Sequence, residues 1–413
     1  MSTFPARAVI DLTAIRANVQ TLTRYAPSAQ VMAVVKGDAY GHGLLPSARA
    51  ARAGGATWLG TAQIAEALAL RAGGVDGRVL AWLYAPGAPL RAAVEADIDL
   101  SVAALWALEE VAQAARLAGR TARVHLKVDT GLGRNGVMPA ELDPVLDLAL
   151  RLQAEGAVEV VGLWSHLAFA DEPGHPTVLA QARVLDESVA RAEGRGLRLE
   201  VRHLAASAAT LTEPAVHYDL VRPGLAVYGL SPVPQVGGPA DFGLVPAMTF
   251  EAELATVKSL PAGHGVSYSH RYVTAQDTVL GVVPVGYADG VPRHASGLDA
   301  RTGAPLQVGG RRLSIAGRVC MDQVVVDLGP GATERAGDRV ELFGTGAGGG
   351  PTAQDWADAA DTISYEIVTR LGSRVPRMYI GAEDLAADAA AEPDRRSAED
   401  PAQRPAPQPE AAR

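Results

Sequence analysis

The chain has only one cysteine, Cys320, among its 413 residues. A single cysteine excludes an internal disulfide and a metal site built from several thiolates. The sequence also lacks an apolar run long enough to cross a bilayer, a secretory signal near its start and any cluster of lysine and arginine. Its net charge of −9 argues against nucleic acid and anionic membranes as partners. We therefore expect a cytoplasmic protein.

Short apolar segments alternate with helical segments over residues 11–229. The predicted strands are 31–36, 57–60, 79–83, 98–102, 123–128, 158–164, 199–204 and 220–221. The predicted helices are 11–25, 47–53, 62–72, 90–96, 104–118, 139–155 and 176–193. This alternation indicates parallel strands joined by helices. Eight strands favour a (β/α)8 TIM-like barrel, with an open Rossmann- or flavodoxin-like sheet as the alternative.

The second part of the chain follows a Pro- and Gly-rich segment at 231–243. Its pattern differs from that of the first part, because short apolar segments are separated by turns rather than by long helices. Short strands are predicted at 249–260, 278–285, 312–315, 319–328 and 339–343, and one helix at 351–369 with Thr352 as its cap. We therefore expect a barrel domain over 1–240 and a mostly β C-terminal domain over 241–381. Residues 382–413 are mainly Ala, Pro and charged residues, which predicts a disordered tail.

Chemically active side chains follow several of the predicted barrel strands. They are Lys36, Arg134, His166, His203 with Ser207, and Arg222. Barrel enzymes place their active sites at this end of the strands, so we expect these groups to share a site for an anionic ligand. A lysine at the end of a buried strand loses hydration, which lowers its pKa and suits it to act as a nucleophile or base. The alternative for each residue alone is a solvated loop position.

Three motifs resemble known binding sites for dinucleotides, nucleotide phosphates or metals, but each lacks a feature that its site requires. Residues 131–136 match G-x-G-x-x-G, but Pro139 follows and no helix opens within the glycines, so we expect a turn rather than a dinucleotide site. The glycines of 344–350 lack the lysine of a Walker loop. His166, Asp171 and His175 lack the spacing of metal ligands, and no metal is predicted.

The segment VVKGDAYGHG at 34–43 resembles the lysine motif of alanine racemases, which bind pyridoxal 5′-phosphate (PLP) on that lysine. Further segments resemble the family's patterns in the same order, at 127–136, 165–166, 221–224, 266–268, 286–290, 319–322 and 363–366. The resemblance extends to about residue 380. It implies a PLP-binding barrel, a β domain and a homodimer whose sites take residues from both chains.

The resemblance also implies a role for each matched residue. Lys36 holds PLP and acts as one catalytic base, and Tyr268 of the second chain acts as the other. The implied phosphate contacts are Tyr40, Ser207, Tyr365, Gly224 and Leu225. Arg222 faces the pyridine nitrogen, His203 supports it, and His166 links it to Tyr268. Arg134 and Met321 of the second chain contact the substrate, and Tyr287 narrows the entrance.

Two positions carry additional implications. Many family members have a carbamylated lysine at the position of Lys127, where it holds the arginine that corresponds to Arg134. Family members often have Asn before the phosphate-binding Ser or Thr, whereas this chain has Ala206. One side-chain contact to the cofactor is therefore expected to be missing.

The implied function is the interconversion of L-alanine and D-alanine by two bases, which supplies D-alanine for peptidoglycan. Racemisation needs a base on each face of the α-carbon. One alternative is a racemase of another small amino acid such as serine, since a single hydroxyl is weakly discriminated. The others are a PLP-dependent decarboxylase, which would carry Cys-Glu where this chain has Cys320-Met321, and a non-catalytic PLP-binding barrel, which would lack a β domain.

Overall fold

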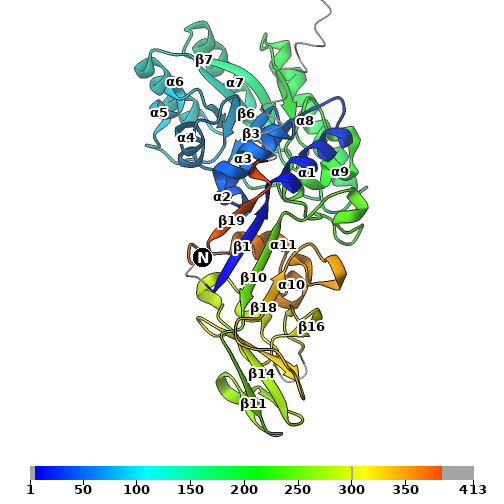
Figure 1. Ribbon diagram of the computed structural model, residues 1–413. Coiled ribbons are helices and arrows are strands. Elements are labelled where there is room, and N and C mark those ends of the chain that lie inside the picture. Colours follow the sequence, from blue (N-terminus) through cyan, green and yellow to red (C-terminus); the bar gives the residue numbers. More distant parts are fainter. Residues whose placement is uncertain (1–4, 299–300, 384–413) are drawn as a thin grey trace, which may run out of the picture.

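The computed structural model describes residues 5–298 and 301–383. A barrel surrounded by helices occupies one end of the molecule, and a group of sheets occupies the other (Figure 1). No helix in these described ranges is both long and apolar enough to cross a membrane. Of the predicted tail at 382–413, residues 384–413 lie outside the described residues.

Eight parallel strands form the barrel in the order β8-β7-β6-β5-β4-β3-β2-β9. Their bounds are β2 Gln30–Val34, β3 Trp58–Thr61, β4 Arg78–Ala81, β5 Asp99–Val102, β6 Ala122–Lys127, β7 Val158–Trp164, β8 Val201–His203 and β9 Leu220–Val221. A bridge between Ala206 and Arg222 brings the two ends of the sheet together. The predicted barrel is confirmed, and the open-sheet alternative is wrong.

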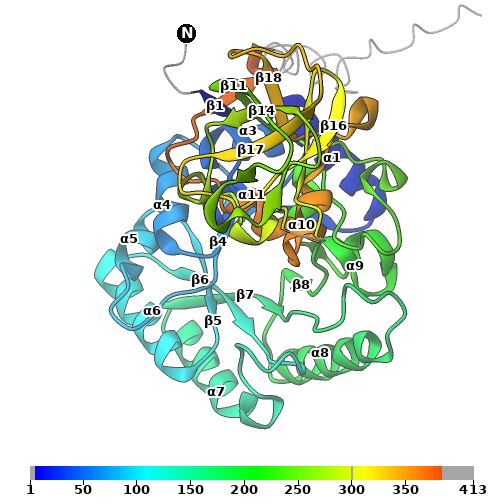
Figure 2. The same ribbon diagram turned by 90° about the horizontal axis from the view of Figure 1, so that it is seen from below.

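Helices surround these strands (Figure 2). They are α1 Leu12–Tyr25, α3 Leu44–Ala53, α4 Ile64–Ala72, α5 Leu90–Glu95, α6 Leu105–Ala118, α7 Leu142–Ala154, α8 Pro176–Gly194 and α9 Ser207–Thr212. Asp11 caps the start of α1, because its Oδ1 accepts hydrogen bonds from the backbone N–H groups of Thr13 and Ala14 at 2.8 and 3.1 Å. The apolar residues of β2 are buried on both faces, as helices outside and packed side chains inside require.

The C-terminal part consists mainly of sheets. A six-stranded sheet has the order β16-β15-β18-β10-β1-β19, a three-stranded sheet has the order β11-β14-β17, and β12 pairs with β13. The bounds are β1 Ala6–Asp11, β10 Met248–Glu253, β11 Thr256–Leu260, β12 Gly265–Val266, β13 Tyr272–Val273, β14 Thr278–Val283, β15 Pro305–Val308, β16 Arg311–Ser314, β17 Val324–Gly329, β18 Arg339–Phe343 and β19 Arg377–Ile380. The predicted β-rich architecture of this part is confirmed.

Three predicted elements in this part were wrong in detail. The strand predicted at 249–260 is two strands, which lie in different sheets. The strand predicted at 319–328 begins only at Val324, since the preceding residues form a turn. The helix predicted at 351–369 is divided into α10 Ala353–Ala360 and α11 Ser364–Thr369, because Asp361 has a φ of 54° and ends the first helix. Thr352 caps α10 as predicted.

The N-terminal strand β1 was not predicted, and it joins the two parts. It pairs with β10 and β19 in the large sheet, and the chain then enters α1 of the barrel (Figure 1). The domain boundaries at 240 and 381 remain a prediction, with β1 contributing to the C-terminal sheet.

Asn18 on α1 connects the barrel to the segment that contains Val227 and Val245, which leads out of it. Its amide donates to Val245 O at 2.9 Å and Val227 O at 3.2 Å, and accepts from Val245 N at 2.8 Å.

We expect Asn18→Ala to lower the free energy of unfolding by about 2 kcal/mol, because it leaves the buried Val227 carbonyl and two backbone groups of Val245 without their partner. Asn18 is fully buried. Urea denaturation followed by circular dichroism measures this change. Thr23→Ala is the control on the same helix, since its hydroxyl donates to Val19 O from an exposed position. Equal losses in the two variants would contradict the role assigned to Asn18.

Candidate active site

One cavity lies at the carboxyl ends of the barrel strands. Its lining residues are Val34, Lys36, Tyr40, Trp82, Lys127, Arg134, Trp164, His166, Ala206, Ser207, Arg222, Gly224 and Tyr365. The structure therefore brings together most of the site residues predicted from the sequence. Among the described residues that line the cavity there are four cations and no carboxylate. This wall attracts an anionic ligand.

The charge of the wall affects both lysines. Burial, followed by the charge of Arg134, lowers the pKa of Lys36, although Glu66 opposes this shift. Burial, Arg222 and Arg134 lower the pKa of Lys127 to about 7. A large fraction of the Lys127 side chains is therefore neutral near pH 7. The lowered pKa of Lys36 likewise favours its neutral amine, which is the form that acts as a base or nucleophile.

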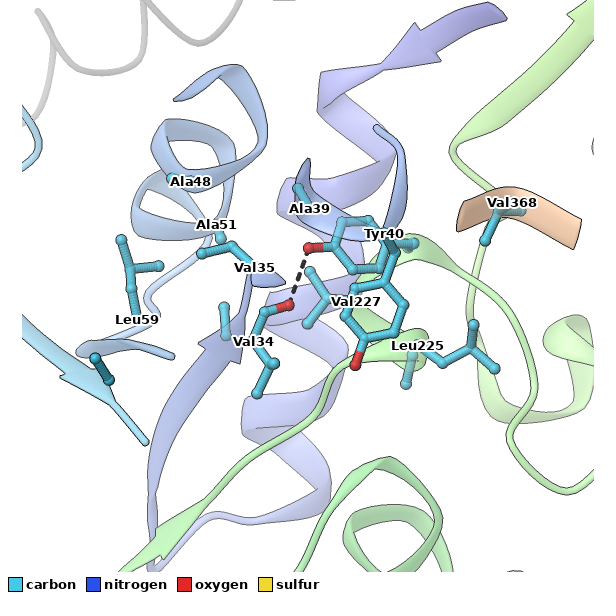
Figure 3. Close-up of a cluster of buried hydrophobic side chains, with 14 of the residues drawn as sticks. Val34, Val35, Ala39, Tyr40, Ala48, Ala51, Leu59, Leu225, Val227 and Val368 are labelled. Carbon is cyan, nitrogen blue, oxygen red and sulfur yellow. Dashed lines mark hydrogen bonds between the residues drawn. The ribbon is translucent and has the colours of Figure 1, made fainter. Parts of the chain in front are cut away.

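The chain makes a left-handed turn directly after Lys36. Gly37, Asp38, Ala39 and Tyr40 have φ values of 63°, 52°, 55° and 54°. Non-glycine residues pay a steric cost in this conformation, so the surrounding structure must hold the turn in place. The turn points the Tyr40 ring into a buried apolar cluster with Leu225, Val227 and Val368 (Figure 3).

Two side chains that the sequence did not identify hold this turn. Glu66 on α4 accepts a hydrogen bond from Gly37 N at 2.6 Å, and its other oxygen caps the start of α4. Arg377 on β19 donates to Gly41 O at 3.0 Å. Close approach of the C-terminal part also requires glycine at position 41, because a Cβ there would lie 2.3 Å from Val368 O. The C-terminal part therefore helps to fix the loop that carries Lys36.

A group of donors suited to phosphate lies beside Tyr40. The Ser207 hydroxyl accepts from Gly224 N at 2.8 Å and from Ala226 N at 3.3 Å. A Cβ on residue 224 would lie 2.2 Å from the Tyr40 hydroxyl, so only glycine leaves room here. Burial raises the pKa of Tyr40 well above its ordinary value, and burial raises the pKa of Tyr365 to about 12. Both phenols therefore stay protonated and able to donate.

Arg222 is held rigidly at the cavity wall. Its guanidinium donates to the carbonyls of Ser165 and Leu204 at 2.9 and 3.1 Å, and to Nδ1 of His203 and His166 at 3.1 and 3.3 Å. Burial lowers the pKa of Arg222 to about 9, which leaves it charged at neutral pH.

The sequence did not identify His125 and Asp99, which lie behind His203. His125 Nδ1 is 2.9 Å from His203 Nε2, and His125 Nε2 is 3.3 Å from Asp99 Oδ2. All three side chains are fully buried. The signal was present, because His125 lies two residues before Lys127 on β6 and alternate strand residues share a face.

Tyr268, Tyr287 and Met321 do not line the cavity in the described part of the chain. They are exposed on the C-terminal part, with exposed fractions of 67%, 42% and 53%. Two hydrogen bonds join the loops that carry the last two, from Tyr287 N to Cys320 O and from Ala288 N to Met321 O, each of 3.0 Å. His203 and Leu225 are not among the residues that line the cavity. His203 lies buried behind Arg222 and accepts its hydrogen bond, as its predicted supporting role requires, and Leu225 is buried.

Two family models match the chain. One, described as alanine racemase, N-terminal domain, matches residues 10–232, and the other, alanine racemase, C-terminal domain, matches residues 247–379. The curated alanine racemase of Beutenbergia cavernae is 61% identical over 382 residues, which are 92% of this chain and 100% of the relative. The alanine racemase of Streptomyces coelicolor is 59% identical over 380 residues, which are 91% of this chain and 96% of the relative.

The chain is also similar to solved structures of alanine racemases. The crystal structure of alanine racemase from D-cycloserine-producing Streptomyces lavendulae has a TM-score of 0.90 and 55% identity, and the match covers 93% of this chain and 100% of that chain. The alanine racemase structure from Streptomyces coelicolor A3(2) has a TM-score of 0.89 and 58% identity, with 92% of this chain and 99% of that chain covered.

The lowered pKa of Lys127 predicts a pH-dependent stability. Below about pH 7 this lysine is protonated in the folded and unfolded states, and its buried charge is unfavourable. Between about pH 7 and the ordinary value of 10.5, the unfolded state binds the additional proton, so the stability that Lys127 contributes rises with pH. We expect Lys127→Met to raise the unfolding temperature most near pH 6 and least near pH 10.

Thermal unfolding of the protein without added ligands, in buffer free of carbon dioxide, measures this difference. Lys258→Met is the control, because Lys258 is exposed on β11. The control should show the same difference from wild type at every pH. A Lys127→Met difference that grows towards high pH would contradict the prediction.

Proposed function

Because this chain belongs to the alanine racemase family, we propose that it interconverts L-alanine and D-alanine with PLP held at Lys36. The chain is accordingly an isomerase. The observation that carries the proposal is the cavity wall, where Lys36, Lys127, Arg134 and Arg222 gather without a lining carboxylate in the described residues. A phosphorylated cofactor and an amino-acid carboxylate are both anions, so such a wall binds both.

The residues present fit PLP. Lys36 would attach it covalently, and Ser207, Tyr40, Tyr365 and the backbone at Gly224 and Leu225 would hold its phosphate. The close approach of the Tyr40 hydroxyl to Gly224, which a Cβ would prevent, gathers these donors in one place and supports this placement. Ala206 contributes no donor here, so backbone and hydroxyl groups carry the phosphate contacts. The rigidly held Arg222 would face the pyridine nitrogen.

When bound, PLP withdraws electrons from the α-carbon of the amino acid and so makes its proton removable. The chain's own groups orient the substrate and move the proton. Arg134 would hold the substrate carboxylate with its charged donors. The neutral Lys36 amine would remove or return the α-proton on one face, and the Tyr268 phenol would do so on the other.

We infer that a second copy of the chain supplies Tyr268, together with Tyr287 at the entrance and the Met321 backbone. The exposure of these three residues away from the cavity supports a homodimer with shared sites. We also propose that the enzyme acts in the cytoplasm and that its D-alanine serves peptidoglycan synthesis. Carbamylation of Lys127 by carbon dioxide, which consumes a neutral amine, agrees with the lowered pKa of this lysine.

Mixing two inactive variants tests the shared site. We expect Lys36→Ala to abolish racemisation and Tyr268→Phe to reduce it by about 10²- to 10⁴-fold, since each lacks one base. Unfolding and refolding the two together with PLP should restore about a quarter of the wild-type activity. Random exchange makes half of the dimers mixed, and each mixed dimer has one intact site of two. Chiral chromatography of D-alanine formed from L-alanine measures the activity.

Tyr272→Phe is the control for the tyrosine, because Tyr272 lies near Tyr268 and donates to Asp327 at 2.7 Å instead. It should retain activity. No recovery on mixing, with both variants folded, would contradict the shared site. Wild-type protein that binds PLP but forms no D-alanine would contradict the proposed reaction, and parallel assays with L-serine would reveal a different small substrate.

A further inference from the structure

A line of hydrogen bonds crosses the interior of the barrel. It begins at Arg222 on the cavity wall, passes through His203 at the end of β8 and His125 within β6, and ends at Asp99, the first residue of β5. The three contacts measure 3.1, 2.9 and 3.3 Å. Arg222 is 4% exposed, and the other three side chains are 0% exposed. The line therefore connects the cavity with the opposite end of the barrel.

The chemistry of the two ends fixes the protons between them. A guanidinium donates but cannot accept, so His203 Nδ1 must accept from Arg222. His203 then carries its proton on Nε2 and donates to His125 Nδ1. His125 in turn carries its proton on Nε2 and donates to Asp99. One direction of donation therefore runs along the whole line, and both histidines are neutral Nε2–H tautomers.

Asp99 is held as an acceptor at the far end. Its Oδ1 accepts from Arg123 Nε at 2.8 Å, and its Oδ2 accepts from Arg78 Nη2 at 2.9 Å as well as from His125. Burial acts to raise the pKa of Asp99, but the hydrogen bond from His125 and the charges of Arg78 and Arg123 outweigh it, so the pKa is lowered and the carboxylate form is stabilised. A protonated Asp99 or a neutral amide in its place would present a donor to one of these groups.

We propose that Asp99 and His125 are positioning residues that hold the Arg222 guanidinium at the cavity wall by fixing the tautomer of His203. This inference rests on the proposed function, in which Arg222 faces the cofactor ring. Were His203 protonated on Nδ1, two donors would face each other and the guanidinium would turn away. Replacing buried charged groups with well-packed apolar residues often costs no stability. The presence of buried His125 and Asp99 is therefore better explained by their effect on the position of the Arg222 guanidinium than by stability.

Asp99→Asn tests the proposal because it keeps the shape and removes the charge. Either orientation of the new amide places its NH₂ group against Arg123 or against His125 and Arg78, and so disturbs the line. We expect the kcat/KM for alanine to fall about ten- to a hundredfold and PLP to dissociate more readily. Asp97→Asn is the matched control, since Asp97 pairs with the same Arg123 at 3.1 Å but is exposed and outside the line. It should change both quantities less than twofold.

A double-mutant cycle separates positioning from simple structural support. If Asp99 acts through His125, Asp99→Asn added to His125→Leu should cause little further loss. Multiplied losses in the double variant would overturn the proposal, because they would show that Asp99 acts through the arginines instead. Equal effects of Asp99→Asn and Asp97→Asn would overturn it as well.

Ring ¹⁵N spectra of histidine-labelled wild-type protein provide a readout that needs no activity. His125 and His203 should each show a bare Nδ1 and a protonated Nε2, and His203 should keep this form over about pH 6 to 8, where an ordinary histidine titrates. His125→Leu assigns one of the two signals. An Nδ1–H or doubly protonated His203 would overturn the proposal even in a fully active racemase. If wild-type protein formed no D-alanine, the function would be wrong, while these spectra would still decide the tautomers.

Discussion

The concentration of positive charge at one end of the barrel is the constraint on which the rest of the site depends. Lys36, Lys127, Arg134 and Arg222 line one partly buried cavity, and none of the described lining residues carries a compensating carboxylate. Such an arrangement is unfavourable until an anion binds or a lysine gives up its proton. It therefore favours both anion binding and neutral lysines, which are the two properties that the proposed chemistry requires.

The remaining contacts serve to keep these groups where they are. The left-handed turn after Lys36 is held by Glu66 from the barrel and Arg377 from the C-terminal sheet. Arg222 is held by the carbonyls of Ser165 and Leu204 and by the buried His203. β1 also lies within the C-terminal sheet and joins it to the barrel, while the contact of Arg377 with Gly41 brings the two parts together beside the site. The C-terminal part thus helps to hold the loop that carries Lys36, in addition to the role proposed for Tyr268.

Much of the barrel could be predicted because its strands are nearly continuous apolar runs separated by helical periods. The strand ends then located Lys36, His166 and Arg222 without further information. The C-terminal part was less predictable, because short strands depend on their partners. β1, β15 and β19 have no distinctive pattern and exist only through pairing with distant segments. Likewise, Asp361 ends a helix in a segment whose composition favours continuation.

The sequence by itself determined the order of the strands, the residues at their ends and the family to which the motifs point, since these follow from local periodicity and short segments. Only the tertiary structure decided which side chains hold the Lys36 loop and Arg222 in place. Asp99 and Glu66 are distant in the chain from His203 and Gly37, and a hydrogen bond across the barrel leaves no periodic signal in the sequence. The physical reason is that Arg222 and Asp99 together fix which nitrogen of His203 and of His125 carries the proton. These two residues are joined through the histidines only after folding.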